Sequence, residues 1–278
     1  MCEAHDIMRG RMESRLTLRC EDSLEGMFTA IYDAFVYKNK MDKPYEDSIT
    51  IAAGEGCMTL FTEEIAVQTD MDKVNKTIHA IQTRLGYSVY DTVLHALCHY
   101  DEERASTVLG YLVRAFAKGS RISEHMADPY VMGVLELSRK VENERQRFYG
   151  FLRFRVIQGE NALIRMDGEP QEREVLFAQI EPKCNLVPIM MEHFESRYPN
   201  ENFIIYDEKR KLAAVHRAYQ TCVLVASEGI VLPESGSDIF EELWKQYFRS
   251  MEIKPRHNER CQNNMMPKWY RKYMPELK

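Results

Sequence analysis

The residues best suited to chemistry in this sequence are the basic and aromatic side chains between 254 and 278. This segment holds seven lysines and arginines against two glutamates, a local charge of +5, while the whole 278-residue chain carries −6. The remaining residues therefore carry −11. Lysine and arginine bind phosphates, and tryptophan and tyrosine rings stack on exposed bases. The pattern predicts one oriented contact with nucleic acid, because an acidic body repels it elsewhere.

A second basic stretch runs from Arg139 to Arg155 and enters a strand predicted over residues 151–157. In an alternating strand, Arg153 and Arg155 share one face, where their guanidinium groups suit phosphate oxygens. The alternative is that these bases pair with some of the 43 acidic residues and that the C-terminus is a basic extension packed by its own aromatics. The candidate nucleic-acid-binding residues are Arg153, Arg155, Arg256, Asn258, Lys268, Trp269, Tyr270, Arg271 and Lys272.

Fingerprints of common enzymes are absent from the sequence. It has no GxxxxGK[ST] phosphate loop, no GxGxxG after a strand, no GxSxG, no HExxH and no CxxxCxxC. No catalytic residue is assigned, and neither a metal nor a cofactor is predicted. An enzyme acting on a nucleoside or a damaged base stays open as an alternative, with Glu181, Glu192, His193 and His216 around a pocket.

The most metal-like cluster is His95, Cys98, His99 and Asp101, because spacings of three and four residues place side chains on one helical face. The preferred alternative is a helix end whose thiol faces the core and whose histidines lie at its margin, where positive charge is favourable. The seven cysteines are scattered at intervals of 18 or more residues without a CxxC, so we expect free thiols in a reducing compartment.

The elements that must position these residues predict an α+β fold. The apolar spacing favours a strand at 16–20, a helix from 24 to 35 capped by Asp22 or Ser23, a short strand at 48–52, helices within 70–118, and a helix from Asp128 toward Phe148. Further strands are predicted at 151–157, 175–180, 203–206, 212–215 and 221–226, with helices at 188–198 and around 240–248.

We expect an antiparallel β-sheet with a segregated helical layer. One elaborated domain over 1–278 is the simplest organisation. The alternative is a strand-helix and helical part over 1–150 and a sheet part over 151–278 that includes the last helix and the basic tail. Since no stretch approaches 18 apolar residues and the N-terminus lacks an apolar signal core, we predict a cytoplasmic protein without membrane contact.

Ordered segments of the chain resemble a bacterial domain-of-unknown-function family whose members are described as DNA metabolism proteins. The segments are SLEGMFTAIYDAF, DPYVMGVLELSRKVENERQRFYGFLRFR, FAQIEPKCNLVPIMMEHFESRYPNENFIIYDEKRKLAAVH and NERCQNNMMPKWYRKYMPE. Family members are encoded beside a radical-SAM protein, and in some chains a similar domain is fused to a uracil-DNA glycosylase-like domain. The resemblance implies an accessory role in DNA repair or modification, with DNA and a radical-SAM protein as partners, and supplies no reaction.

The leading expectation is therefore a nucleic-acid-binding accessory factor in DNA metabolism. A third class, besides the enzyme, is a protein-binding subunit of the radical-SAM protein whose Met265, Met266 and Met274 dock the partner through adaptable apolar contacts. The oligomeric state stays open. The position of Arg153 and Arg155 relative to residues 268–272 distinguishes a binding role from a structural one. If the two segments share one groove, they form a binding surface; if they lie on opposite faces, at least one of them is structural.

Overall fold

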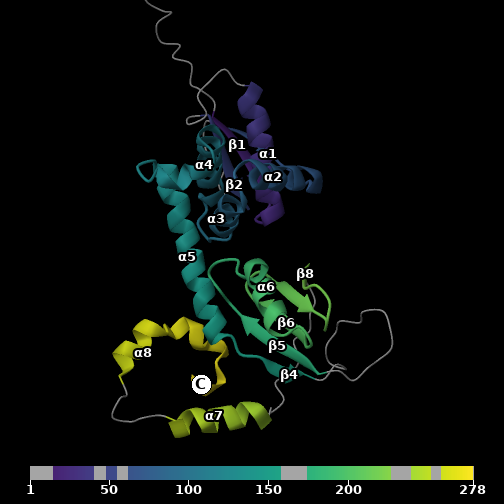
Figure 1. The fold of residues 1–278 in the computed structure, drawn as a ribbon, viewed down its shortest axis with the longest axis vertical. Coiled ribbons are helices and arrows are strands. Elements are labelled where there is room, and N and C mark those ends of the chain that lie inside the picture. The colour runs from purple at the N-terminus through teal and green to yellow at the C-terminus, as the bar shows by residue number, and fades with distance from the viewer. Residues whose placement is uncertain are drawn as a thin grey trace, which may run out of the picture. The chain divides into compact units, whose positions relative to one another are not determined.

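The computed structural model describes residues 15–40, 48–54, 62–157, 174–226, 239–251 and 258–277, and most of its helices and strands are labelled in Figure 1. The chain divides into two compact units, Met1–Glu142 and Asn143–Lys278. The division falls within the long helix α5 (Pro129–Phe151). No helix among the described residues combines the length and the apolar character needed to cross a membrane.

Unit 1 contains a parallel sheet of three strands in the order β2-β1-β3, formed by β1 (Arg15–Cys20), β2 (Ile49–Ala53) and β3 (Thr62–Ala66). Both faces of the central strand β1 are covered, since Thr17 is buried along with Leu16 and Leu18. The Thr17 and Thr50 hydroxyls hydrogen-bond across the strands at 3.0 Å. Parallel neighbours need a crossover, and α1 (Leu24–Lys40) provides it between β1 and β2.

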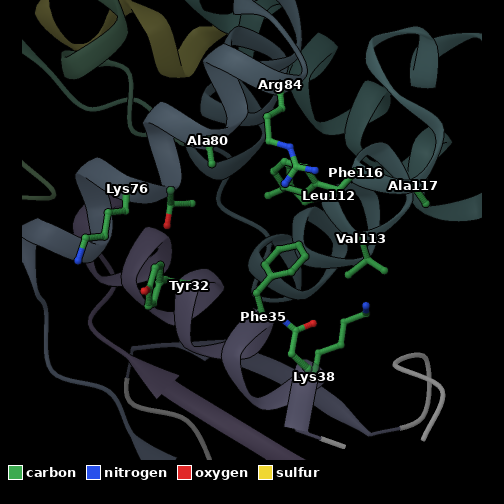
Figure 2. Close-up of a pocket in the computed structure, with 12 residues that line it drawn as sticks. Tyr32, Phe35, Lys38, Lys76, Ala80, Arg84, Leu112, Val113, Phe116 and Ala117 are labelled. Atoms are coloured by element: carbon green, nitrogen blue, oxygen red, sulfur yellow. The ribbon is translucent and has the colours of Figure 1, made fainter. Parts of the chain in front are cut away.

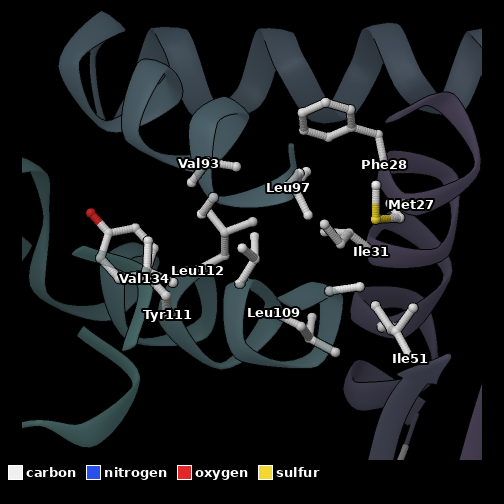
Figure 3. Packing of buried hydrophobic residues seen from close by; sticks show 14 of the residues in the cluster. Met27, Phe28, Ile31, Ile51, Val93, Leu97, Leu109, Tyr111, Leu112 and Val134 are labelled. Carbon is white, nitrogen blue, oxygen red and sulfur yellow. The ribbon is translucent and has the colours of Figure 1, made fainter. Parts of the chain in front are cut away.

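The helices of unit 1 follow the predicted apolar stripes. Besides α1, they are α2 (Met71–Arg84), α3 (Tyr87–Leu97), α4 (Arg104–Lys118), the short 3-10 helix η2 (Ser120–Glu124) and the first part of α5. The Ser23 hydroxyl accepts a hydrogen bond from the Gly26 amide at 3.0 Å, so Ser23 provides the cap of α1. Figure 3 shows the core between these helices, where Phe28, Ile31 and Leu112 are almost completely buried.

Unit 2 contains a mixed sheet in the order β4-β5-β6-β7-β8. Its strands are β4 (Arg155–Ile157), β5 (Val175–Ile180), β6 (Asn202–Asp207), β7 (Leu212–His216) and β8 (Val223–Ala226). The pair β5–β6 is parallel because α6 (Val187–Arg197) carries the chain back between them, and the other pairs are antiparallel. The predicted α+β content is confirmed, but the prediction of an antiparallel sheet is wrong for β5–β6 and for all of unit 1.

The predicted strand over 151–157 is shorter than expected, because α5 continues through Phe151 and the Leu152 amide still donates to the Phe148 carbonyl at 2.9 Å. Arg153 therefore precedes the strand, and its alternation with Arg155 on one strand face does not exist. The chain continues with α7 (Ile239–Met251), α8 (Glu259–Met265) and the 3-10 helices η4 (Lys268–Tyr273) and η5 (Pro275–Leu277). We call residues 258–277 the C-terminal segment.

Candidate nucleic-acid interface

Tyr270 anchors the C-terminal segment on the last turns of α5. Its side chain is 5% exposed, and its ring meets Phe148 and Phe151 edge-on, with centroid distances of 5.2 and 5.4 Å. The Tyr270 hydroxyl accepts a hydrogen bond from Arg147 at 3.4 Å. Burial raises the pKa of the phenol. A ring covered in this way stabilises the fold and has no face left for a base.

Arg153 joins the end of α5 to the end of the C-terminal segment. Its Nε and Nη2 contact the same Oε1 atom of Glu276 at 2.9 and 2.8 Å, and the Glu276 side chain is 1% exposed. Its Nη1 donates to the carbonyls of Gly150 and Leu152 at 2.7 and 3.1 Å. A guanidinium at this position donates to carbonyls that have no hydrogen-bond partner within the helix, and its positive charge interacts favourably with the helix dipole. Arg153 is therefore occupied within the protein.

Lys272 and Tyr273 form a second attachment, to the loops after β5 and β6. The Lys272 ammonium contacts the carboxylate of Glu181 and that of Glu208, the latter at 3.1 Å, and the Tyr273 hydroxyl donates to the same two groups. The bond to Glu181 raises the pKa of Lys272, while burial and the bond to Glu208 raise the pKa of Tyr273 to about 12. Since the Lys272 side chain is 52% exposed, its ion pairs contribute little to stability.

Two further candidates maintain α8 itself. The Asn258 side chain accepts from the Cys261 amide at 3.0 Å and caps the start of the helix. Arg271 donates to Asn263 Oδ1 at 2.8 Å and to the Met266 carbonyl at 2.9 Å, which fixes the end of the helix. Both residues therefore shape the segment.

Trp269 and Lys268 are exposed candidates that neither form an ion pair nor cap a helix among the described residues. Trp269 is 36% exposed, and its ring is held edge-on by Phe148 at 6.2 Å. The ammonium of Lys183 lies 5.5 Å from the centre of the Trp269 ring, and Lys268 is exposed beside it in the sequence. We call Lys183, Lys268 and Trp269 the Trp269 surface. It combines a flat ring with two cations, the chemistry that binds a base and its neighbouring phosphates.

The remaining two candidates contribute nothing to this surface in the part of the chain that the structure describes. Arg155 lies on β4, and its guanidinium is 5.0 Å from the centre of the Phe177 ring. Arg256 lies outside the described residues.

Lys183 is a functional candidate that sequence reasoning missed. It lies in the turn after β5, where the amides of Lys183 and Cys184 donate to the two carboxylate oxygens of Glu144 at 2.9 and 3.0 Å. Glu144 is 6% exposed and belongs to α5, so the same helix positions the lysine and the tryptophan. A single lysine in a turn carries no pattern, and no sequence signal could have selected it.

The four residues proposed for an enzyme have separate surroundings. His216 is buried, its Nδ1 lies 2.9 Å from the Glu201 carbonyl, and its ring stacks on Phe203. His193 stacks on Tyr149 at 3.9 Å, and burial lowers the pKa of its imidazole. Glu181 contacts the C-terminal segment, as described above, and Glu192 is exposed. These contacts describe structural histidines and surface acids.

The metal-like cluster at the end of α3 also has structural contacts. His95 lies beside Asp91 and Glu142 at 3.8 and 4.0 Å, and Nδ1 of His99 accepts from the Asp101 amide at 3.0 Å. Within the described ranges, no group of three or more His, Cys, Asp or Glu side chains is arranged to hold a metal ion.

A comparison with known protein families finds one whose model covers more than half of the chain. The model of a domain of unknown function, DUF4130, matches residues 102–276. The chain belongs to the DUF4130 family. The predicted membership in a domain-of-unknown-function family is thereby confirmed, and the DUF4130 match includes α5, the unit 2 sheet and nearly the whole C-terminal segment. No curated protein and no solved structure matches the chain.

Proposed function

We propose that this protein is a nucleic-acid-binding accessory factor in DNA repair or modification, acting with a radical-SAM protein. The observation that carries the proposal is the Trp269 surface, where the ammonium of Lys183 lies over an exposed indole ring. In the proposed complex one base of a single strand stacks on Trp269, while Lys183 and Lys268 meet the adjoining phosphates.

The contacts of the C-terminal segment support a rigid platform. Phe148 contacts the Trp269 ring edge-on, the buried ring of Tyr270 lies against it with a centroid distance of 3.9 Å, and Arg153 fastens the far end of the segment. A ring that is already held loses little conformational entropy when a base stacks on it. The acidic remainder of the chain favours this one orientation, because a net charge of −11 outside residues 254–278 repels phosphates.

Binding of a labelled oligothymidylate, followed by fluorescence anisotropy over a range of salt concentrations, tests the proposal. Two phosphate contacts predict a log–log salt slope of magnitude about 1.4, since each single-strand phosphate contributes about 0.7. Trp269→Ala is expected to weaken binding by about 5- to 150-fold, the equivalent of about 1–3 kcal/mol for one stacked base. Lys183→Met and Lys268→Met should each lower the slope by about 0.7.

Lys209→Met is the matched control, because Lys209 is exposed in unit 2 and its side chain has no ion-pair partner among the described residues. It should leave both the affinity and the slope unchanged. Binding that is undetectable, or independent of salt, contradicts the proposal. An equal effect of Trp269→Ala and the control removes the Trp269 surface as the contact.

The surface of α7 favours a second candidate function, a protein-binding subunit. Leu243, Trp244, Tyr247 and Met251 are 55, 39, 53 and 62% exposed, and their spacing places them along one stripe of the helix. An exposed apolar stripe of this kind fits a groove on another protein. The sequence-based alternative assigned this role to Met265, Met266 and Met274; Met265 is 72% exposed, whereas Met274 is 2% exposed and is closed to a partner.

Co-purification with the radical-SAM protein separates the two functions. Leu243→Glu with Tyr247→Glu should abolish the pair if α7 docks the partner, whereas Trp269→Ala should leave it intact. A pair that survives the α7 variant excludes this stripe as the docking surface.

A further inference from the structure

Unit 1 contains a cavity between α1, α2 and α4 that has no part in the proposed function. Its volume is about 460 Å³, within the range of small-molecule sites. Phe35 of α1 and Leu112, Val113 and Phe116 of α4 give it an apolar wall. Figure 2 shows the Phe35 ring in the middle of this pocket, with Arg84 on one side of it and Lys38 on the other.

The charged side chains around the cavity are all positive. Lys38, Lys76 and Arg84 line it, and no carboxylate is among the described residues that do so. Neither lysine has an ion-pair partner in the described part of the chain. The neighbouring Lys73 differs, because both oxygens of Asp33 hold its ammonium at 2.8 and 2.9 Å. The lysine outside the cavity is thus paired with an aspartate, whereas the lysines that line the cavity can still bind an anion.

The aromatic side chains give the cavity flat surfaces next to these cations. The Phe35 and Phe116 rings meet edge-on at 5.5 Å, and the Arg84 guanidinium lies over Phe116 at 5.3 Å from its centre. A guanidinium that lies over a ring keeps its N–H groups in its own plane, where they can bind a phosphate. Tyr32 and Asn39 add a hydroxyl and an amide to the lining.

We propose that this cavity binds a free nucleotide, whose base packs against Phe35 and Phe116 and whose phosphate lies between Lys38 and Arg84, with Lys76 at the edge of the pocket. A planar apolar body joined to a compact multiple anion is the ligand class that matches both sets of side chains. The site differs from the Trp269 surface in location and residues, so each can fail without the other.

Isothermal titration of the full chain with AMP, adenosine, inorganic phosphate and dodecanoate tests the assignment. AMP should bind, and adenosine and phosphate should bind at least tenfold more weakly, since each satisfies one half of the cavity. Arg84→Met and Lys38→Met should weaken AMP binding about tenfold or more, the equivalent of one charge-assisted hydrogen bond. Arg84→Lys should recover part of the loss.

Lys118→Met is the control, because Lys118 is an exposed base of α4 outside the cavity lining. Val113→Trp tests the same point without a change of charge, since a larger side chain fills the space and should abolish binding in a protein whose melting temperature is retained. The proposal is overturned if AMP does not bind, if dodecanoate alone binds, or if the cavity variants behave like Lys118→Met. A single-stranded oligonucleotide that competes with AMP and loses affinity on Arg84→Met would likewise refute a free nucleotide as the ligand.

Discussion

Replacing Arg153 by methionine tests whether one ion pair holds the C-terminal segment. The Glu276 side chain is 1% exposed and that of Arg153 27%, so the carboxylate depends on the guanidinium in place of water. Removing one partner of a buried pair costs about 3–5 kcal/mol. Because Arg153 is partly exposed, we expect the lower limit, about 3 kcal/mol, which raises the equilibrium constant for local opening roughly 150-fold.

Native-state hydrogen exchange measures this opening at the amides of Tyr270, Met274 and Leu277, which donate to carbonyls within the C-terminal segment. Lys268→Met is the matched control and should change protection by less than about 0.5 kcal/mol, since it alters only an exposed side chain. Combining Arg153→Met with Glu276→Leu should restore most of the protection, because no buried charge remains. Equal exchange in Arg153→Met and the control would refute the reasoning.

Three further predictions concern pH, packing and thiol reactivity. The pKa of Tyr273 is about 12 in the fold and about 10 in the unfolded chain, so its contribution to stability is complete below pH 10 and is lost as the pH rises through 12. The C-terminal segment should therefore loosen between pH 10 and 12. A phenolate titration that lacks this high midpoint, relative to Tyr273→Phe, contradicts the prediction. Gly110→Ala should lower the free energy of unfolding by about 1–3 kcal/mol, since its Cβ would lie 2.2 Å from the Tyr130 ring. The Cβ of Gly150→Ala meets nothing within 4 Å, so that variant should be neutral or stabilising by up to about 1 kcal/mol. Equal urea midpoints for the two variants would be evidence against this packing. Burial raises the pKa of Cys222 to about 12, so an alkylating reagent at pH 8 should label it only after denaturation, and rapid labelling of the folded protein by mass spectrometry would disagree.

Local sequence patterns predicted most elements but could not predict strand direction. The strand over 175–180 and the apolar stripes of the helices have the expected periods, because each depends on neighbours a few residues away. The direction of a strand depends on where a crossover returns the chain, and α6 makes β5 and β6 parallel. Strand β3 was not predicted because its adjacent Glu63 and Glu64 interrupt the alternation of apolar residues.

The candidate site was predicted as a segment but not as a set of contacts. Charge and aromatic content indicate residues 254–278, yet they do not reveal which cations already have partners. Arg153 and Glu276 are 123 residues apart, and only the folded chain shows that they pair. The same contact that removes Arg153 from a binding role makes the platform under Trp269 rigid. The accessible lysine of the turn after β5 is equally invisible to sequence patterns.

The packing of Tyr270 on α5 also determines when the end of this helix can be covered during protein synthesis. The end of α5 exposes Phe148 and Phe151 until a residue 123 positions after Arg147 has been made. At roughly 5–20 residues per second, this interval lasts about 6–25 s on the ribosome. Folding of a small helical region takes far less time than that. Phe148 and Phe151 at the end of α5 therefore stay without the Tyr270 ring during this interval of synthesis. A chaperone that shields them during the interval should raise the yield of folded protein.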